Sequence, residues 1–373
     1  MFSRADIDVL RLCAWCKDLP APICRNVPAD ILDWLEELSF IRCAESGPSF
    51  RMTPRGMAFL EQIGFSVEAD GQYRSGDVLR RRLQTAEITA FFWRIGANVF
   101  YESPRAETCT GSFLPSFALR RKEVTNVLGS SRLFGFYYTD HTVFVPYYVA
   151  PDNEGIYPAV EQRTFRAENL SLGRRPYVLY TGDGSLKDLL SLVQKETVKK
   201  GKQTIDSFWT AIPKLNCPVA VLPMGEDGMR QLRILTVPDY KERLLRALFG
   251  KDYLPPVLAQ SDGRSKSGHT TYVVGFDCNI ARLEEVIRQS KEEPHIIVLS
   301  TQFDAVAPYF YGKNAAVSAV DIAEVETLLG IPHELPPVPM DAFITEKGEP
   351  VYVPPIRQIE GAGRKGRSTR RKA

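Results

Sequence analysis

The chain has 373 residues, a formal net charge of +2, and hydrophobic and charged shares of 44% and 25%, which are typical of a globular protein. No apolar run approaches the ~18 residues that a membrane-spanning helix needs, and acidic residues interrupt the first 20 positions, which disfavours a signal peptide. Seven cysteines, an odd number, favour reduced thiols over a disulfide framework. We therefore expect a cytoplasmic protein of two or three domains.

The N-terminal part of the sequence begins with helical patterns. Ser3 and Asp6 have the spacing of a helix capping box, and apolar residues at helical spacing follow until prolines interrupt them. A short helix is expected at 23–26. Pro28 then opens a third helix, because proline suits the first turn of a helix.

Two strands joined by a turn are predicted next, at 40–44 and 49–52. Thr53 then has the character of an N-cap, and Pro54 takes the first helical position, where its missing N–H costs nothing. Three helices followed by a hairpin is the order of a winged helix. We therefore predict a winged helix-turn-helix domain at 1–68.

The expected third helix of this domain is acidic on its outward face, where Asp30, Asp33 and Glu37 lie. Residues 1–68 carry seven basic and ten acidic residues. A winged helix usually places its third helix in the DNA major groove, and acidic side chains there repel phosphates. Two interpretations follow: the domain serves dimerisation or protein contact, or DNA contact comes from the wing, a partner subunit or basic segments elsewhere.

Four cysteines fall in the same domain, and two of them form a C-x-x-C pair: Cys13, Cys16, Cys24 and Cys43. Such a set can suggest zinc. However, the pair falls near the apolar face of a predicted helix, and no second pair or histidine pair follows. Buried reduced cysteine behaves as a small hydrophobic residue, so we expect no metal.

A connector at 69–110 contains a strong predicted helix at 77–96. Arg80, Arg81 and Arg82 cluster near its start. Three adjacent arginines cannot all face one way on a helix. One or two of them are therefore candidates for phosphate contact, and a solvated helix face is the alternative.

The region 111–358 is predicted to be a mixed α/β domain. Similar strand–turn–helix patterns at 176–194 and 271–289 suggest two related α/β units. Residues 316–330 are predicted to close the sheet or to form a last helix, and a proline-rich stretch at 332–355 to wrap the surface. The expected elements, in chain order, are strands at 132–139, 141–150 and 155–163, a strand and helix at 176–195, strands at 217–224 and 232–237, a helix at 239–249, a strand at 270–277, a helix at 280–289 and a strand at 295–301.

Most catalytic motifs are missing from the sequence. It contains no phosphate-binding G-x-x-x-x-G-K-[ST] loop, no G-x-S-x-G elbow and no close histidine pair. One arrangement, Asp152 followed by Glu161-x-Arg163 on a predicted strand, resembles the metal-dependent restriction-endonuclease pattern, in which two acids hold Mg²⁺. Arginine replaces the expected lysine and cannot readily lose a proton. No cofactor is therefore predicted, except Mg²⁺ if the nuclease alternative holds.

A glycine-rich basic tail at 359–373 cannot bury a core, and we expect it to be disordered. Such a tail attracts polyanions through counterion release, or alternatively serves as a solubilising tail. The predicted phosphate contacts, all in basic clusters, are Arg80, Arg81, Arg82, Arg120, Arg121, Lys122, Lys199, Lys200, Lys202, Arg364, Lys365, Arg367, Arg370, Arg371 and Lys372.

Two stretches, "RMTPRGMAFL" at 51–60 and "LRRRLQTAEITAFF" at 79–92, together with the large α/β region, resemble replication-relaxation proteins of bacterial plasmids and conjugative elements. The resemblance implies a DNA-associated accessory protein for replication or conjugative transfer that binds duplex DNA without catalysis. Its implied partners are double-stranded DNA, other replication or transfer proteins and a second copy of the chain. The alternatives are a metal-dependent nuclease with a restriction-endonuclease-like larger domain, and a winged-helix protein-interaction module.

Overall fold

The computed structural model describes residues 1–43, 48–67, 75–100, 110–120, 128, 131–151, 155–195, 199–200, 203–204 and 206–349. At 120, 167–172, 199–200 and 203–204 it describes the backbone alone. The chain is mixed α/β, which confirms the predicted class. None of the described helices combines the length and apolar character needed to cross a membrane.

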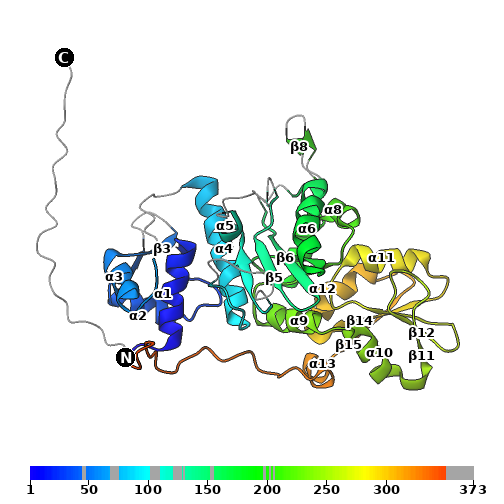
Figure 1. Cartoon of the computed structure of the whole chain (residues 1–373). Coiled ribbons are helices and arrows are strands. Elements are labelled where there is room, and N and C mark those ends of the chain that lie inside the picture. The colour runs from blue at the N-terminus through cyan, green and yellow to red at the C-terminus, as the bar shows by residue number, and fades with distance from the viewer. Residues whose placement is uncertain are drawn as a thin grey trace, which may run out of the picture.

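The N-terminal unit, residues 1–67, packs helices around a small sheet whose strand order is β1-β3-β2 (Figure 1). Its elements are α1 (Arg4–Cys16), β1 (Leu19–Pro20), α2 (Ala29–Glu37), β2 (Ile41–Cys43), β3 (Ser49–Met52) and α3 (Pro54–Gln62).

Local signals in the sequence place these elements well. Ser3 and Asp6 exchange both bonds of a capping box, with Ser3 N–H donating to the Asp6 carboxylate at 2.7 Å. The Thr53 hydroxyl accepts from Gly56 N–H, and Pro54 is the first helical residue, as predicted. The predicted helix at 23–26 is wrong: the chain turns there and α2 starts at Ala29. Prolines on both sides leave too few residues for a stable helical turn.

A five-stranded sheet with order β10-β7-β6-β5-β4 forms the first α/β unit. β4, β5 and β6 run antiparallel, and β6, β7 and β10 run parallel. The elements of this unit are α4 (Gly76–Arg94), β4 (Phe113–Pro115), α5 (Ser116–Arg120), β5 (Gly135–Tyr138), β6 (Thr142–Tyr148), α6 (Pro158–Leu172), β7 (Arg175–Thr181), α7 (Leu186–Val193), the hairpin of β8 (Lys199–Lys200) and β9 (Gln203–Thr204), α8 (Phe208–Leu215), β10 (Val219–Val221) and α9 (Glu226–Thr236).

A second five-stranded sheet, with order β11-β12-β13-β14-β15, repeats the same strand directions. β11, β12 and β13 run antiparallel, and β13, β14 and β15 run parallel. The elements of this second unit are α10 (Tyr240–Phe249), β11 (Tyr253–Leu254), β12 (Gly263–Ser265), β13 (Thr271–Val274), α11 (Ile280–Gln289), β14 (Pro294–Leu299), α12 (Phe303–Val306), β15 (Ala316–Val320) and α13 (Ile322–Leu329).

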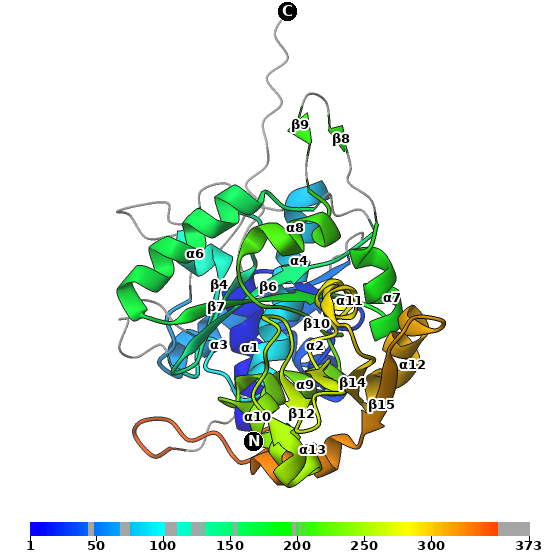
Figure 2. The ribbon, with the colours of Figure 1, turned by 90° about the vertical axis from the view of Figure 1, so that its right-hand side faces the viewer.

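The two sheets lie in the middle layer of a three-layer α/β/α arrangement (Figure 2). Alternate strand residues point to opposite faces, so Phe144 packs toward α4 while Val143 and Val145 pack toward α6, α7 and α8. The sheets meet where Val221 N–H donates to the Asp277 carbonyl at 2.8 Å. The buried Gln231 amide closes the junction by donating to the carbonyl groups of Val221 and Phe276.

Two predicted strands are helices instead. Residues 155–163 contribute to α6, in which Glu161, Thr164 and Phe165 are buried at helical spacing. A buried polar Glu161 hides that spacing from a hydrophobicity pattern. Residues 232–237 belong largely to α9, whose first turn contains Gly228. Gly228 packs so closely there that a Cβ would collide with the Pro223 carbonyl oxygen, so its role is close contact rather than a turn.

The segment 336–343, which we call the C-terminal strap, leads from α13 back to the N-terminal unit (Figure 1). Ala5 N–H donates to the Pro339 carbonyl at 2.8 Å, and Phe343 N–H donates to the Phe2 carbonyl at 2.9 Å. The proline-rich stretch therefore lies across the surface as predicted, as far as residue 349. The N-terminal unit is therefore joined to the rest of the molecule in two places: through the chain that follows it and through the strap.

Candidate functional site

The predicted phosphate contacts Arg80, Arg81 and Arg82 make contacts within the protein. Arg82 forms an ion pair of 3.1 Å with Asp18, whose side chain is 3% exposed. Arg81 donates to the Leu133 carbonyl at 2.8 Å. Arg80 pairs with the neighbouring Asp77 on the exposed side of α4. Arg81 and Arg82 thus hold α4 against its neighbours, and a phosphate would have to displace these bonds.

The other predicted cations fall largely beyond what the structure describes. The backbone of Arg120 ends α5, and Lys199 and Lys200 form β8, but their side chains lie outside the described part. The remaining candidates lie wholly outside the described residues: Arg121, Lys122, Lys202, Arg364, Lys365, Arg367, Arg370, Arg371 and Lys372.

The nuclease-like residues do not form the predicted arrangement on a strand. Glu161 lies in α6 and is fully buried, where it accepts from the Tyr147 hydroxyl at 2.6 Å and from Arg132 N–H at 2.8 Å. Burial raises the pKa of Glu161 despite these two donors. Arg163 lies on the exposed surface of α6, and Asp152 falls outside the described residues. Glu161 therefore works as an internal hydrogen-bond acceptor.

The N-terminal cysteines differ in their exposure to solvent. Cys13, Cys16 and Cys24 are buried, while Cys43 is exposed. Burial raises the pKa of the Cys16 thiol to about 12, so this group stays protonated at neutral pH. The part of the chain that the structure describes contains no cluster of three or more His, Cys, Asp or Glu residues able to hold a metal ion.

A cavity of about 1190 Å³ opens where the two α/β units meet. Its walls come from β7, α8 and the start of β10 on one side, and from α10, α11 and the loops around β12 and β13 on the other. Trp209, Ile212 and Pro213 of α8 contribute apolar lining, and charged side chains from the second unit line the cavity as well. Volumes of ~300–1,000 Å³ are usual for ligand sites, so this cavity has room for a sizeable molecule.

Four charged side chains form the floor of this cavity, which we call the charged floor. They are Lys241 at the start of α10, Asp262 before β12, Asp277 after β13 and Arg282 on α11. Arg282 lies 3.1 Å from one Asp262 oxygen and 3.0 Å from one Asp277 oxygen. Lys241 Nζ lies 3.0 Å from the other Asp262 oxygen and 3.9 Å from Asp277. Two cations therefore alternate with two carboxylates.

Two ions of the charged floor, Asp262 and Arg282, are kept ionised by their neighbours. Burial opposes ionisation of Asp262, yet Arg282 and Lys241 together hold its pKa below the usual value. Burial likewise disfavours the charge on Arg282, but Asp277 and Asp262 raise its pKa. The Lys241 side chain is the most accessible of the four, with 27% of its surface exposed.

Tyr240 also lines this cavity, and its buried hydroxyl lies beside the Tyr177 hydroxyl. The residue is 7% exposed, and burial raises the pKa of its hydroxyl well above the usual range.

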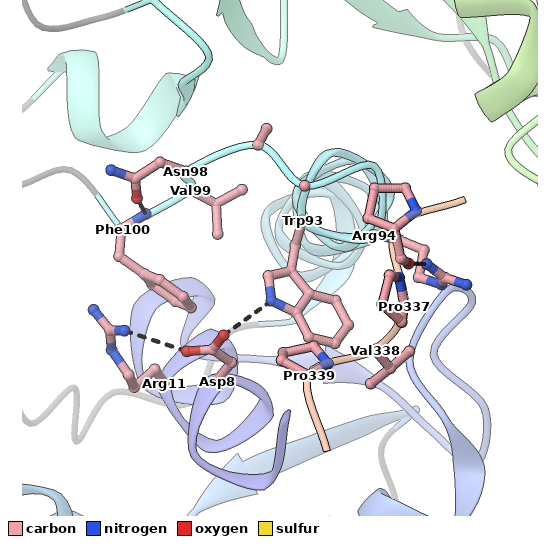
Figure 3. A pocket seen from close by; sticks show the side chains of 13 residues that line it. Asp8, Arg11, Trp93, Arg94, Asn98, Val99, Phe100, Pro337, Val338 and Pro339 are labelled. Carbon is pink, nitrogen blue, oxygen red and sulfur yellow. Dashed lines mark hydrogen bonds and ion pairs between the residues drawn. The ribbon is translucent and has the colours of Figure 1, made fainter. Parts of the chain in front are cut away.

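A smaller cavity of about 350 Å³ lies between α1, the end of α4 and the C-terminal strap (Figure 3). Trp93 donates to Asp8 at 3.3 Å, and Arg11 pairs with the same carboxylate at 3.3 Å. The Arg11 guanidinium also lies 3.9 Å from the Phe100 ring centre. Burial raises the pKa of Asp8. Because these polar groups already bind one another, this cavity is better explained as packing beneath the strap.

Sequence reasoning missed the charged floor entirely. Its members come from four separate elements, and each looks ordinary in its local context. The available signal was weak: Asp277 directly follows an apolar strand, and Arg282 lies five residues later on the next helix. No family model, curated protein or solved structure matches the chain.

Proposed function

We propose that this protein is a DNA-associated accessory protein of a mobile genetic element, which binds duplex DNA without catalysis. The observation that carries the proposal is the arrangement of helices and strands in the N-terminal unit. Its three-stranded sheet β1-β3-β2 and the hairpin β2–β3 directly after α2 support a winged helix in which two helices, rather than the predicted three, precede the hairpin.

Contact with DNA is proposed for the wing, the hairpin β2–β3, because α2 is unsuited to it. Asp30, Asp33 and Glu37 of α2 are exposed and would repel phosphates. On the hairpin, Arg42 is exposed and lies directly across from Arg51 in the strand register. Arg51 is paired with buried Asp18, so Arg42 is the residue that presents positive charge on the hairpin, where α2 presents negative charge.

A restriction-endonuclease-like origin is proposed for the α/β units. Each follows the order helix, three antiparallel strands, helix, parallel strand, which supports such a core. Glu161 is bound inside the protein and is fully buried, so the nuclease alternative has no acidic residue in a position to contact a phosphodiester among the predicted residues that the structure describes. The proposal is accordingly binding without cleavage.

The experiment begins with selection of bound fragments from a pool of duplex DNA by the full chain. Affinity for the selected duplex is then measured against salt concentration for Arg42→Glu. Reversing one phosphate contact should weaken binding at least about tenfold and lower the slope of log K against log salt by about 1.

Lys251→Glu is the matched control, because it makes the same charge change beyond the end of α10, at the opposite end of the molecule from the N-terminal unit (Figure 1). It should leave affinity and slope nearly unchanged. Equal losses in both variants would mean that only net charge matters, and no selected sequence with no salt-sensitive binding would contradict the proposal.

A protein-interaction module is the second candidate, favoured by one observation. Trp34 is 40% exposed in the middle of the acidic face of α2. Aromatic side chains rimmed by charges are common at protein interfaces. Under this alternative Trp34→Ala would abolish self-association measured by sedimentation and leave duplex binding intact; under the DNA proposal it changes neither.

A further inference from the structure

We propose that the cavity between the two α/β units binds a nucleobase, with the base stacked on Trp209 and its polar edge against the charged floor. The inference goes beyond duplex binding by the N-terminal unit and uses different residues. It assigns a ligand class to a site that the sequence patterns did not predict.

The charge of the floor selects against other common ligands. The two carboxylates, Asp262 and Asp277, are matched by the two cations, Lys241 and Arg282, so the floor has no net charge. A phosphate would lie against two carboxylates, and a divalent cation against an arginine and a lysine. A ligand whose polar edge is uncharged avoids both costs.

The hydrogen-bonding groups of the floor suit an edge that both donates and accepts. Lys241 carries three N–H donors and has one close carboxylate, at 3.0 Å, with a second at 3.9 Å. Carboxylate oxygens of Asp262 accept from amino groups. Alternating donors and acceptors of this kind match the edge of a nucleobase.

The walls suit a flat ring. Trp209 of α8 and Tyr177 of β7 both line the cavity, and Trp209 is partly exposed. Stacking of a base on an aromatic side chain tolerates any base, because every base has a π-face. The volume of about 1190 Å³ exceeds what one base needs, so the attached sugar and a neighbouring nucleotide also fit.

The test is calorimetric titration of the full chain with adenosine, guanosine, cytidine and thymidine in turn. At least one nucleoside should bind saturably. Trp209→Ala should weaken that binding at least about tenfold, because stacking on one aromatic ring is lost. Trp34→Ala removes an exposed tryptophan outside the cavity and should leave the affinity unchanged.

A measurement on the unmodified chain covers the case in which a variant fails to fold. A saturating nucleoside should slow amide hydrogen exchange in α8 and α11, which both line the cavity. Saturable binding lost in Trp209→Ala and protection confined to these helices support the proposal. No saturable binding of any nucleoside or oligonucleotide, or protection elsewhere only, overturns it.

The base has two sources, a free nucleoside or a base on a nucleic acid strand. A short single-stranded deoxyoligonucleotide and its abasic counterpart distinguish them, since only the strand source predicts tighter binding of the intact oligonucleotide than of the nucleoside. Equal binding of intact and abasic strands without nucleoside binding overturns the proposal. Arg42→Glu should weaken duplex binding and spare nucleoside binding, so the two proposals fail separately.

Discussion

The two α/β units share strand order and strand directions, yet their helices bring opposite charges to equivalent places. In the first unit, the helix after the third strand supplies Glu161, which binds Tyr147 and the backbone before β5. In the second unit, the corresponding helix supplies Arg282, which binds Asp262 before β12. The same connection of strands therefore supports a buried acid in one unit and a buried base in the other.

The difference extends to what surrounds these groups. Glu161 is sealed in the interior, while the charged floor lines a cavity that opens toward solvent. Topology alone thus decides where helices lie and leaves the chemistry to individual side chains. If the second unit carries a binding site, its charges must tolerate solvent and a ligand, whereas the first unit needs only internal stability.

Arg282→Leu should produce the largest effect. The change leaves Asp262 and Asp277 buried with only Lys241 to compensate them, and unpaired buried charges cost about 3–5 kcal/mol. Unfolding in guanidinium chloride measures the loss. Arg288→Leu, on the same helix but in an exposed pair with Glu285, is the matched control and should leave the free energy of unfolding nearly unchanged. Equal costs would show that the charged floor is not a stabilising cluster.

Glu87→Gln should change the pH dependence of stability. Burial raises the pKa of Glu87 in α4 from 4.5 to about 7, and its Oε2 has no partner in the described structure. Between these pH values the folded chain holds a proton that the unfolded chain has lost, so stability falls as pH rises through this window.

The fall attributable to Glu87 should reach up to about 3 kcal/mol, and the glutamine variant should lack it. Thermal unfolding of both proteins from pH 4 to pH 8 gives the comparison. Parallel curves for the two proteins would mean that Glu87 has the same pKa folded and unfolded. Such a result would mean that burying the Glu87 carboxylate in the first unit has no pH-dependent cost in stability.

Glu161→Gln should have the smallest effect. The amide oxygen can accept from Arg132 N–H, while the amide nitrogen donates to the Tyr147 hydroxyl. Because burial raises the pKa of Glu161, losing its charge removes little, and the cost should stay below about 1 kcal/mol. Chemical denaturation tests this, with Glu161→Ala expected to cost more. A loss above about 3 kcal/mol for the glutamine variant would mean that the buried Glu161 stabilises the first unit about as much as Arg282 stabilises the second.

Much of the local structure was predictable because its signals are short. The capping residues Ser3 and Thr53 act within one helical turn, and the helix at 280–289 matches α11. The misses at 155–163 and 232–237 share one cause: Glu161 and Gln231 are buried polar residues on the core-facing side of a helix. A hydrophobic pattern cannot identify such a face.

The candidate site was not predictable for a different reason. Lys241, Asp262, Asp277 and Arg282 meet only after β12 and β13 pair and α11 packs beside them. β12 itself has three residues, too few to show an alternating pattern. The arginines that did attract attention, Arg81 and Arg82, are used within the protein.

The C-terminal strap affects the order in which parts of this protein become fully folded during synthesis. Ribosomes make the N-terminal unit before the α/β units, but Arg4, Ala5 and Phe2 form backbone hydrogen bonds with residues 339–343, which are synthesised after both α/β units. Until then these backbone groups bind water or other partners. The start of α1 is therefore fully hydrogen-bonded only after the α/β units have been made, and shortening the chain before residue 336 would leave it without these bonds.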